Sequence, residues 1–187
     1  MRIVSNRWPT VADGRRYLFL PTTSDRGGPS RARLDTYKER VRLEPGEATP
    51  AVFERLRRRL FDYEIFSPSV VGYRLLPASP ITDGCTVVQR IGVGVVFLES
   101  ATRVVDMWDT ADPDGSRGAG FAYVALQGHP ERGVATFEVR QEGDAVFVVL
   151  TARSVPGTML TKIASPATRL VQRTITKQAM RRLTTGR

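Results

Sequence analysis

Residues 134–152 read VATFEVRQEGDAVFVVLTA, and this stretch decides the fold class. In its first half Phe137 and Val139 alternate with polar neighbours, which is the period of a strand with one buried and one wet face. A Glu-Gly-Asp turn at 142–144 then leads into a second apolar run at 145–152. Because so short a connection joins antiparallel neighbours, the stretch predicts a β-hairpin.

Further strands are expected upstream of this hairpin. Segments rich in Val, Phe and Tyr, separated by turns containing Pro or Gly, occupy residues 70–76, 85–91, 95–99, 102–108 and 118–126. The connections between them are short, so the sequence predicts an antiparallel meander.

One helix is expected before the meander and one after it. Residues 49–62 begin with Thr49 as a candidate N-cap and Pro50 in the first turn, followed by apolar residues three and four positions apart. From Ser165 to Leu183 a second helical pattern carries an apolar stripe. The opposite face of this second helix is basic, with Arg169, Arg173, Lys177 and Arg181.

This order of elements predicts an α+β fold, because the helix stripe has to be buried on the apolar face of the sheet. A helix, an antiparallel meander and a long last helix follow each other as in the helix-grip architecture. By analogy with that architecture, we expect the sheet to curve around the C-terminal helix and leave a cavity between them. Residues 1–33 are irregular and are interpreted as an arm or lid, and residues 34–187 as one domain.

Composition excludes several classes of site. Cys85 and His129 are the single cysteine and the single histidine, so neither an internal disulfide framework nor a usual zinc site is expected. No apolar run approaches the roughly 20 residues of a membrane span. The first residues lack the apolar region of a secretion signal, which predicts a cytoplasmic protein. No cofactor is expected.

Two segments, GFAY at 120–123 and GHPERG at 128–133, carry a resemblance to a known family. They look like the signature of the bacterial and plant family called domain of unknown function nineteen-ninety, and the resemblance extends over residues 37–184. It implies a place near the Bet v 1-like, or SRPBCC, superfamily, whose members bind lipids, sterols and polyketides or catalyse cyclisation and dehydration. Departures from the family pattern next to the signature, at residues 124, 125, 127, 134 and 135, predict an altered pocket mouth.

Three residues are candidates for acid–base chemistry. His129 has the one side chain with an ordinary pKa near neutrality, and Glu131 lies two residues away, so the two are predicted to transfer protons. The alternative is a structural turn in which both side chains bind backbone groups. Asp106, beside Trp108 on a predicted strand, is a candidate buried carboxylate with a raised pKa.

Aromatic residues on the strands are candidates for an apolar pocket. The predicted ligand-binding residues are Tyr73, Trp108, Phe121, Tyr123 and Phe137. Ordinary core packing is the alternative for each of them, although Tyr123 and Trp108 keep a hydrogen-bonding group.

These features predict a protein that holds a small, largely apolar molecule or biosynthetic intermediate between sheet and helix. If such a protein is an enzyme, the expected reaction is a cofactor-independent cyclisation, dehydration or isomerisation in natural-product biosynthesis. The alternative is a non-catalytic carrier or sensor of a lipid-like molecule. A further alternative follows from the net charge of +9, which suits a basic interaction module. An acidic carrier protein is then a possible partner on the basic C-terminal helix face, whereas nucleic acid is unlikely because no recognition motif accompanies the charge.

Overall fold

A computed structural model of the chain describes residues 2–4, 15–23, 33–68, 70–77, 80–93, 96–156 and 165–185. The strands are β1 (Arg2–Val4), β2 (Arg33–Arg40), β3 (Val71–Leu76), β4 (Thr86–Val93), β5 (Val96–Ala111), β6 (Arg117–Ala125), β7 (Glu131–Glu142) and β8 (Ala145–Pro156). The helical elements are a 3-10 turn, η1 (Arg15–Tyr17), and the α-helices α2 (Thr49–Phe61) and α4 (Ser165–Thr185).

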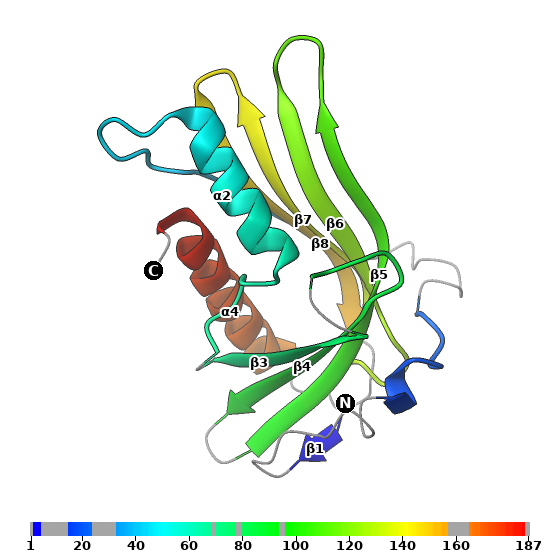
Figure 1. Cartoon of the computed structure of the whole chain (residues 1–187). Coiled ribbons are helices and arrows are strands. Elements are labelled where there is room, and N and C mark those ends of the chain that lie inside the picture. The colour runs from blue at the N-terminus through cyan, green and yellow to red at the C-terminus, as the bar shows by residue number, and fades with distance from the viewer. Residues whose placement is uncertain are drawn as a thin grey trace.

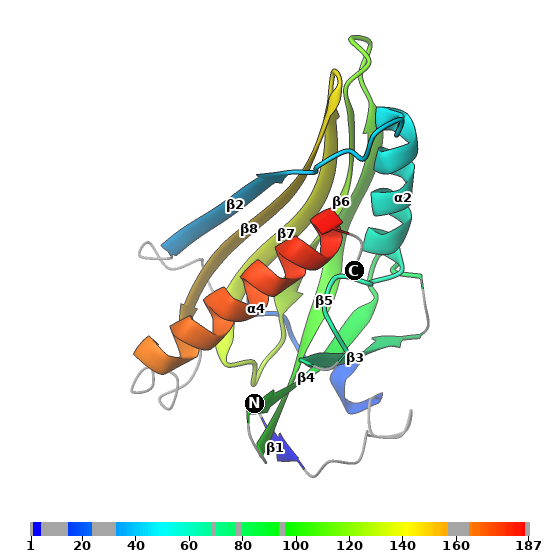
Figure 2. The ribbon, with the colours of Figure 1, turned by 90° about the vertical axis from the view of Figure 1, so that its left-hand side faces the viewer.

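The strands form one antiparallel sheet in the order β2-β8-β7-β6-β5-β4-β3, with β1 paired to β5. Figure 1 shows α2 and α4 on the same side of this sheet, which we call the inner face, and Figure 2 shows α4 crossing in front of β7 and β8. The main hydrophobic core joins side chains of both helices to those of the inner face, including Phe121 and Phe137. The predicted antiparallel meander is therefore confirmed.

Two strand predictions were wrong in their boundaries. The segments expected at 95–99 and 102–108 form the single strand β5, because no turn residue interrupts the chain between them. Strand β2 was not predicted, since charged residues dominate its sequence. It is an edge strand whose pairing partner is β8, with Tyr37 opposite Leu150, and backbone hydrogen bonds to β8 define it.

Helix α2 begins where the sequence predicts, but its cap differs. Ala48 is the N-cap and makes no side-chain capping bond, so the prediction of Thr49 as the cap was wrong. The hydroxyl of Thr49 instead donates to the carbonyl oxygen of Asp144, at 3.2 Å, and so ties the helix to the turn between β7 and β8. The buried residues of α2 recur every three or four positions: Val52, Phe53, Leu56 and Leu60.

Helix α4 is anchored by its second half. The main core buries Ala179, Met180 and Leu183 of this helix. Lys177 and Arg181 are exposed, as expected for residues of the predicted basic face. The side chains of residues 165–173, including the predicted basic residues Arg169 and Arg173, lie outside the described residues. No helix among the described residues is both long and apolar enough to cross a membrane.

The N-terminal segment 15–23 packs on the opposite side of the sheet, the outer face (Figure 1). Arg103 of β5 holds it by donating to the carbonyl oxygens of Leu18, Tyr17 and Leu20, at 2.6, 3.1 and 3.3 Å. A second, smaller core forms beneath it from Tyr17, Leu76, Val88, Ala101 and Leu126. This part of the expected arm therefore lies away from the helices; residues 5–14 and 24–32 lie outside the described part of the chain.

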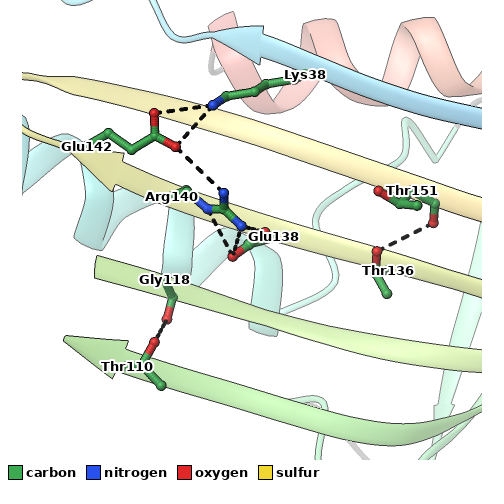
Figure 3. A network of polar contacts seen from close by, with 8 residues as sticks. All are labelled: Lys38, Thr110, Gly118, Thr136, Glu138, Arg140, Glu142 and Thr151. Carbon is green, nitrogen blue, oxygen red and sulfur yellow. Dashed lines mark hydrogen bonds and ion pairs between the residues drawn. The ribbon is translucent and has the colours of Figure 1, made fainter. Parts of the chain in front are cut away.

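Ion pairs lie on the outer face of β2 and β7. Figure 3 shows a network in which Lys38 of β2 binds Glu142 of β7, with 3.0 Å between Nζ and Oε1. Arg140 binds both Glu138 and Glu142 on the same strand, at 2.9 and 3.7 Å. This is the wet face that the alternation in residues 134–141 predicts.

Candidate functional site

Three polar side chains meet on the inner face, in the middle of the main core. The amide of Gln89, on β4, donates to the hydroxyl of Tyr63 at 2.5 Å, and both residues hydrogen-bond with the hydroxyl of Tyr123 on β6. Gln89 and Tyr63 are buried, and Tyr63 is fully so. Buried polar groups are costly unless they are bonded, and here they satisfy one another.

The backbone of Tyr63 is strained so that its ring can reach this position. Tyr63 follows α2 and adopts a φ of 58°, a left-handed conformation that costs a residue with a Cβ about 1–2 kcal/mol. The turn directs the ring into the core, where it forms an edge contact with Tyr73 at a centroid distance of 4.8 Å. Strained residues of this kind persist where the surrounding structure fixes them, and they cluster at functional sites.

Aromatic rings surround the three polar groups. Phe121 and Phe137 stack at 5.4 Å, and the ring of Tyr123 lies 5.4 Å from that of Phe137. Phe66 meets Phe137 edge-on at 6.2 Å. Four of the predicted pocket residues, Tyr73, Phe121, Tyr123 and Phe137, are therefore brought together on the inner face.

The hydroxyl of Tyr123 is a hydrogen-bond donor at neutral pH. Burial raises its pKa to about 12, against the opposing effect of the hydrogen bonds with Gln89 and Tyr63, and the negative charge of Glu131 adds to the rise. Burial likewise raises the pKa of Tyr63 well above its ordinary value. Both phenols keep their protons, so the group offers neutral donors rather than a base.

Small side chains lie beside Tyr123 across the sheet. In register with it are Ala135 on β7 and then Ala152 on β8, and both are only partly buried. Ser154 is the next inner-face residue of β8 after Ala152. Its hydroxyl donates a hydrogen bond to Oε2 of Glu131, on β7, at 3.0 Å. A carboxylate therefore lies near a protonated phenol, at one end of a strip of small residues.

The prediction for Asp106 and Trp108 was wrong. A β-bulge between Val104 and Asp106 inserts one extra residue into β5, so that Asp106 pairs with Ala122 and both face outward. Asp106 is exposed, not a buried carboxylate. Trp108 pairs with Gly120 and covers it on the outer face, where a Cβ on that glycine would lie 2.4 Å from the indole ring.

His129 takes part in the turn between β6 and β7. Its Nδ1 lies 3.0 Å from the backbone nitrogen of Glu131 and 2.9 Å from the carbonyl oxygen of the same residue, and the backbone N–H of His129 donates to the carbonyl of Leu126. Burial lowers the pKa of His129 to about 4, so the ring is neutral at pH 7. This geometry fits the structural-turn alternative, since Nδ1 is held by backbone groups of the turn.

The shifted pKa of His129 predicts a pH dependence of stability. The folded state binds the proton more weakly than the unfolded chain, whose histidine has a pKa of 6.5. The stability from the neutral ring is therefore complete above pH 6.5 and lost as the pH falls to about 4, a change of about 3 kcal/mol.

The His129→Asn variant is the control, because the amide oxygen can accept the backbone N–H of Glu131 without titrating. Urea unfolding of both proteins at several pH values from about 7.5 to about 4 measures the effect. The difference in unfolding free energy should shift in favour of the variant as the pH falls. Parallel pH profiles would show that the histidine does not titrate with folding.

Two members of the polar group, Tyr63 and Gln89, were not among the predicted site residues. Gln89 offers a signal in retrospect, because it is a polar residue on the apolar face of its strand, between Val87 and Ile91. Tyr63 offers none, since its position depends on the turn after α2. Among the described residues, no group of His, Cys, Asp and Glu side chains is arranged to hold a metal ion.

Comparisons with known proteins agree with this architecture. The sequence model described as Domain of unknown function (DUF1990) matches residues 20–182. The NMR structure of the KanY protein has a TM-score of 0.54 at 15% identity, covering 83% of this chain and 97% of that chain. At this identity the likeness concerns the fold alone.

Two further solved structures are similar at lower scores. Norcoclaurine synthase from Thalictrum flavum, in complex with dopamine and hydroxybenzaldehyde, has a TM-score of 0.45 at 8% identity, covering 81% of this chain and 86% of its own. The major latex-like protein 151 from Panax ginseng has a TM-score of 0.40 at 12% identity, covering 80% and 98%. No curated protein matches the sequence. The family match spans most of the chain and contains both signature segments, so the protein belongs to the DUF1990 family.

Proposed function

We propose that the protein binds a small, largely apolar molecule on the inner face, between the sheet and the helices, with one polar atom of the ligand on the hydroxyl of Tyr123. The observation that carries this proposal is the Tyr63–Gln89–Tyr123 group, three bonded polar side chains set among aromatic rings. Ligand sites combine an apolar lining with a few placed polar groups in this way.

We place the apolar part of the ligand on the strip of small residues beside Tyr123. Ala135 and Ala152 are inner-face residues with short side chains, and they are less buried than Phe137 and Leu150 further along the same two strands. An apolar molecule lying on them would place its polar end against the phenol and its flank near Glu131. The cavity between sheet and α4, expected from the helix-grip architecture, is part of this proposal.

The same groups suit a cofactor-independent isomerisation or cyclisation. In an isomerisation, the Glu131 carboxylate would take a proton from a carbon next to a carbonyl and return it at another carbon. The Tyr123 phenol would donate a hydrogen bond to the oxyanion that develops meanwhile. Glu131 rather than His129 is the proposed base, because its carboxylate is charged and that charge acts on the Tyr123 hydroxyl.

The Tyr123→Phe variant tests the binding proposal, since it removes one hydroxyl and keeps the ring. Native mass spectrometry of protein purified from its own host should show about one small molecule per chain, which solvent extraction then identifies. Loss of the hydrogen bond is expected to weaken binding of that molecule by roughly tenfold. Tyr17→Phe is the matched control, because it makes the same change on the outer face.

Three outcomes distinguish the proposed ligand-binding protein, as enzyme or as carrier, from the alternative of a basic interaction module. An empty chain that co-purifies with nucleic acid or an acidic protein would contradict the binding proposal. Equal affinity of the Tyr123→Phe and Tyr17→Phe variants would remove Tyr123 from the site. Conversion of an unreacted precursor by the wild type, but not by Glu131→Gln, would show an enzyme, whereas retention without any product would show a carrier.

A further inference from the structure

Arg59 lies in the last turn of α2 and Arg182 in the last turn of α4, and the two side chains are near enough for the charge of one to act on the other. Arg59 precedes Leu60 and Arg182 precedes Leu183, and both leucines are buried in the main core. The core therefore fixes the backbone on each side of the pair. The side chain of Arg59 is only 14% exposed, and Arg182 is partly buried.

Among the described residues, one carboxylate forms an ion pair with these two arginines. Within the described residues, Arg59 has Glu64 as its ion-pair partner, with 3.5 Å between Nε and Oε2, and Glu64 is half exposed. Arg182 makes no ion pair or hydrogen bond there, and its Nε is buried without an acceptor. Burial lowers the pKa of Arg59, and the nearby charges of Arg182 and Arg55 lower it further.

A purely structural role does not explain this arrangement. The C-terminal end of a helix favours a cation through its dipole, and both arginines lie at such ends. The dipole nevertheless gives the buried Nε of Arg182 no acceptor, and it does not explain why two cations lie near each other. A negatively charged acceptor would bind the Nε–H of Arg182 and would also reduce the repulsion between the two arginines.

We propose that Arg59 and Arg182 bind an oxyanion, either a carboxylate or a phosphate group, that accepts hydrogen bonds from both guanidinium groups. The planar guanidinium fork matches the two oxygens of such a group. Two sources supply it: a free small oxyanion, or the charged end of a larger ligand.

The position of Tyr73 favours the second source. Its ring contacts Tyr63 of the polar group, and the charge of Arg182 acts on its hydroxyl. Tyr73 therefore connects the arginine pair to the aromatic surroundings of the proposed ligand. On this argument, which rests on the proposed function, the ligand is an apolar molecule with one carboxylate or phosphate.

Inorganic phosphate is the first probe, and the Nε–H resonance of Arg182 in the wild-type chain is the readout. Phosphate should shift this resonance and raise the melting temperature of the wild type. Arg182→Gln should lose the stabilisation, whereas Arg181→Gln should keep it. The two variants make the same change in net charge at neighbouring positions of one helix, but Arg181 is exposed. An unmoved resonance, or equal responses of the two variants, would overturn the site.

Decanoate and decanol, which share one alkyl chain, then distinguish the sources. If the oxyanion belongs to an apolar ligand, decanoate should bind the wild type at least about tenfold more tightly than decanol, and Arg182→Gln should abolish that difference. Phosphate binding without a preference for decanoate would assign the site to a free oxyanion. Decanol binding with no effect of phosphate or of Arg182→Gln would reject the anion site and leave the proposed function standing.

Discussion

Replacing Gly133 by alanine is expected to lower the free energy of unfolding by about 3 kcal/mol or more. Gly133 has a φ of 149°, and an added Cβ would lie 2.0 Å from the carbonyl oxygen of Arg153 and 2.8 Å from the Cα of Ser154. Both contacts are with backbone of the paired strand β8, so no side-chain rotation relieves them. The two strands would have to separate where Ser154 meets Glu131.

Gly143→Ala is the matched control for this prediction. Gly143 also has a positive φ, of 58°, but an added Cβ there meets nothing within 4 Å. Its cost is therefore the conformational one alone, about 1–2 kcal/mol. Denaturant unfolding of the two variants gives both values. Similar losses in the two proteins would mean that the close approach of β7 and β8 at Gly133 contributes nothing.

This result would explain the last glycine of the GHPERG segment. The sequence presents that segment as a possible catalytic turn, because it contains the single histidine and a glutamate. In the structure His129 binds the backbone of Glu131 through Nδ1, and Gly133 allows β8 to approach. Much of the GHPERG segment is thus accounted for by backbone geometry.

The antiparallel meander and the two helices were predictable from sequence because their determinants are local. Alternation in strands, Gly and Pro turns and the four-residue recurrence in the last helix each depend on neighbouring residues alone. Strand β2 lacks such a local signal, because its charged residues give no apolar pattern. It is a strand because it pairs with β8, which is distant in the sequence. Long-range pairing of an edge strand leaves little trace in its own sequence.

The candidate site was predicted only in part, for a related reason. Tyr73, Phe121, Tyr123 and Phe137 were expected to line an apolar pocket because they are aromatic residues on predicted strands, and they lie together on the inner face. Asp106 was assigned to the wrong face of the sheet. One extra residue in a β-bulge turns the following side chains of the strand to the opposite face, and no residue type in the sequence indicates a bulge here. The partnership of Gln89 with Tyr123 depends on the sheet order, which brings β4 and β6 to either side of β5.

The second large effect is expected at Glu99, a buried carboxylate on the outer face. Its side chain has no exposed surface and binds Arg90, at 3.0 Å, together with Arg16 and the hydroxyl of Tyr17, at 2.6 Å. Burial alone would raise the pKa of Glu99, but these hydrogen bonds and the charge of Arg16 outweigh it and lower the pKa. Glu99 is therefore ionised at neutral pH, and it joins the N-terminal segment to the sheet.

Glu99→Ala should cost about 3–5 kcal/mol, because it leaves the guanidinium of Arg90, 4% exposed, without this carboxylate. Glu142→Ala is the control: Glu142 also contacts two cations on the outer face, Lys38 and Arg140, but it is 40% exposed (Figure 3). Exposed pairs contribute less than about 1 kcal/mol. Urea unfolding measures both losses, and limited proteolysis reports whether residues 15–23 detach. If Glu99→Ala costs no more than Glu142→Ala and leaves the segment protected, then Arg103 and the Tyr17 core hold the segment in place without the ion cluster.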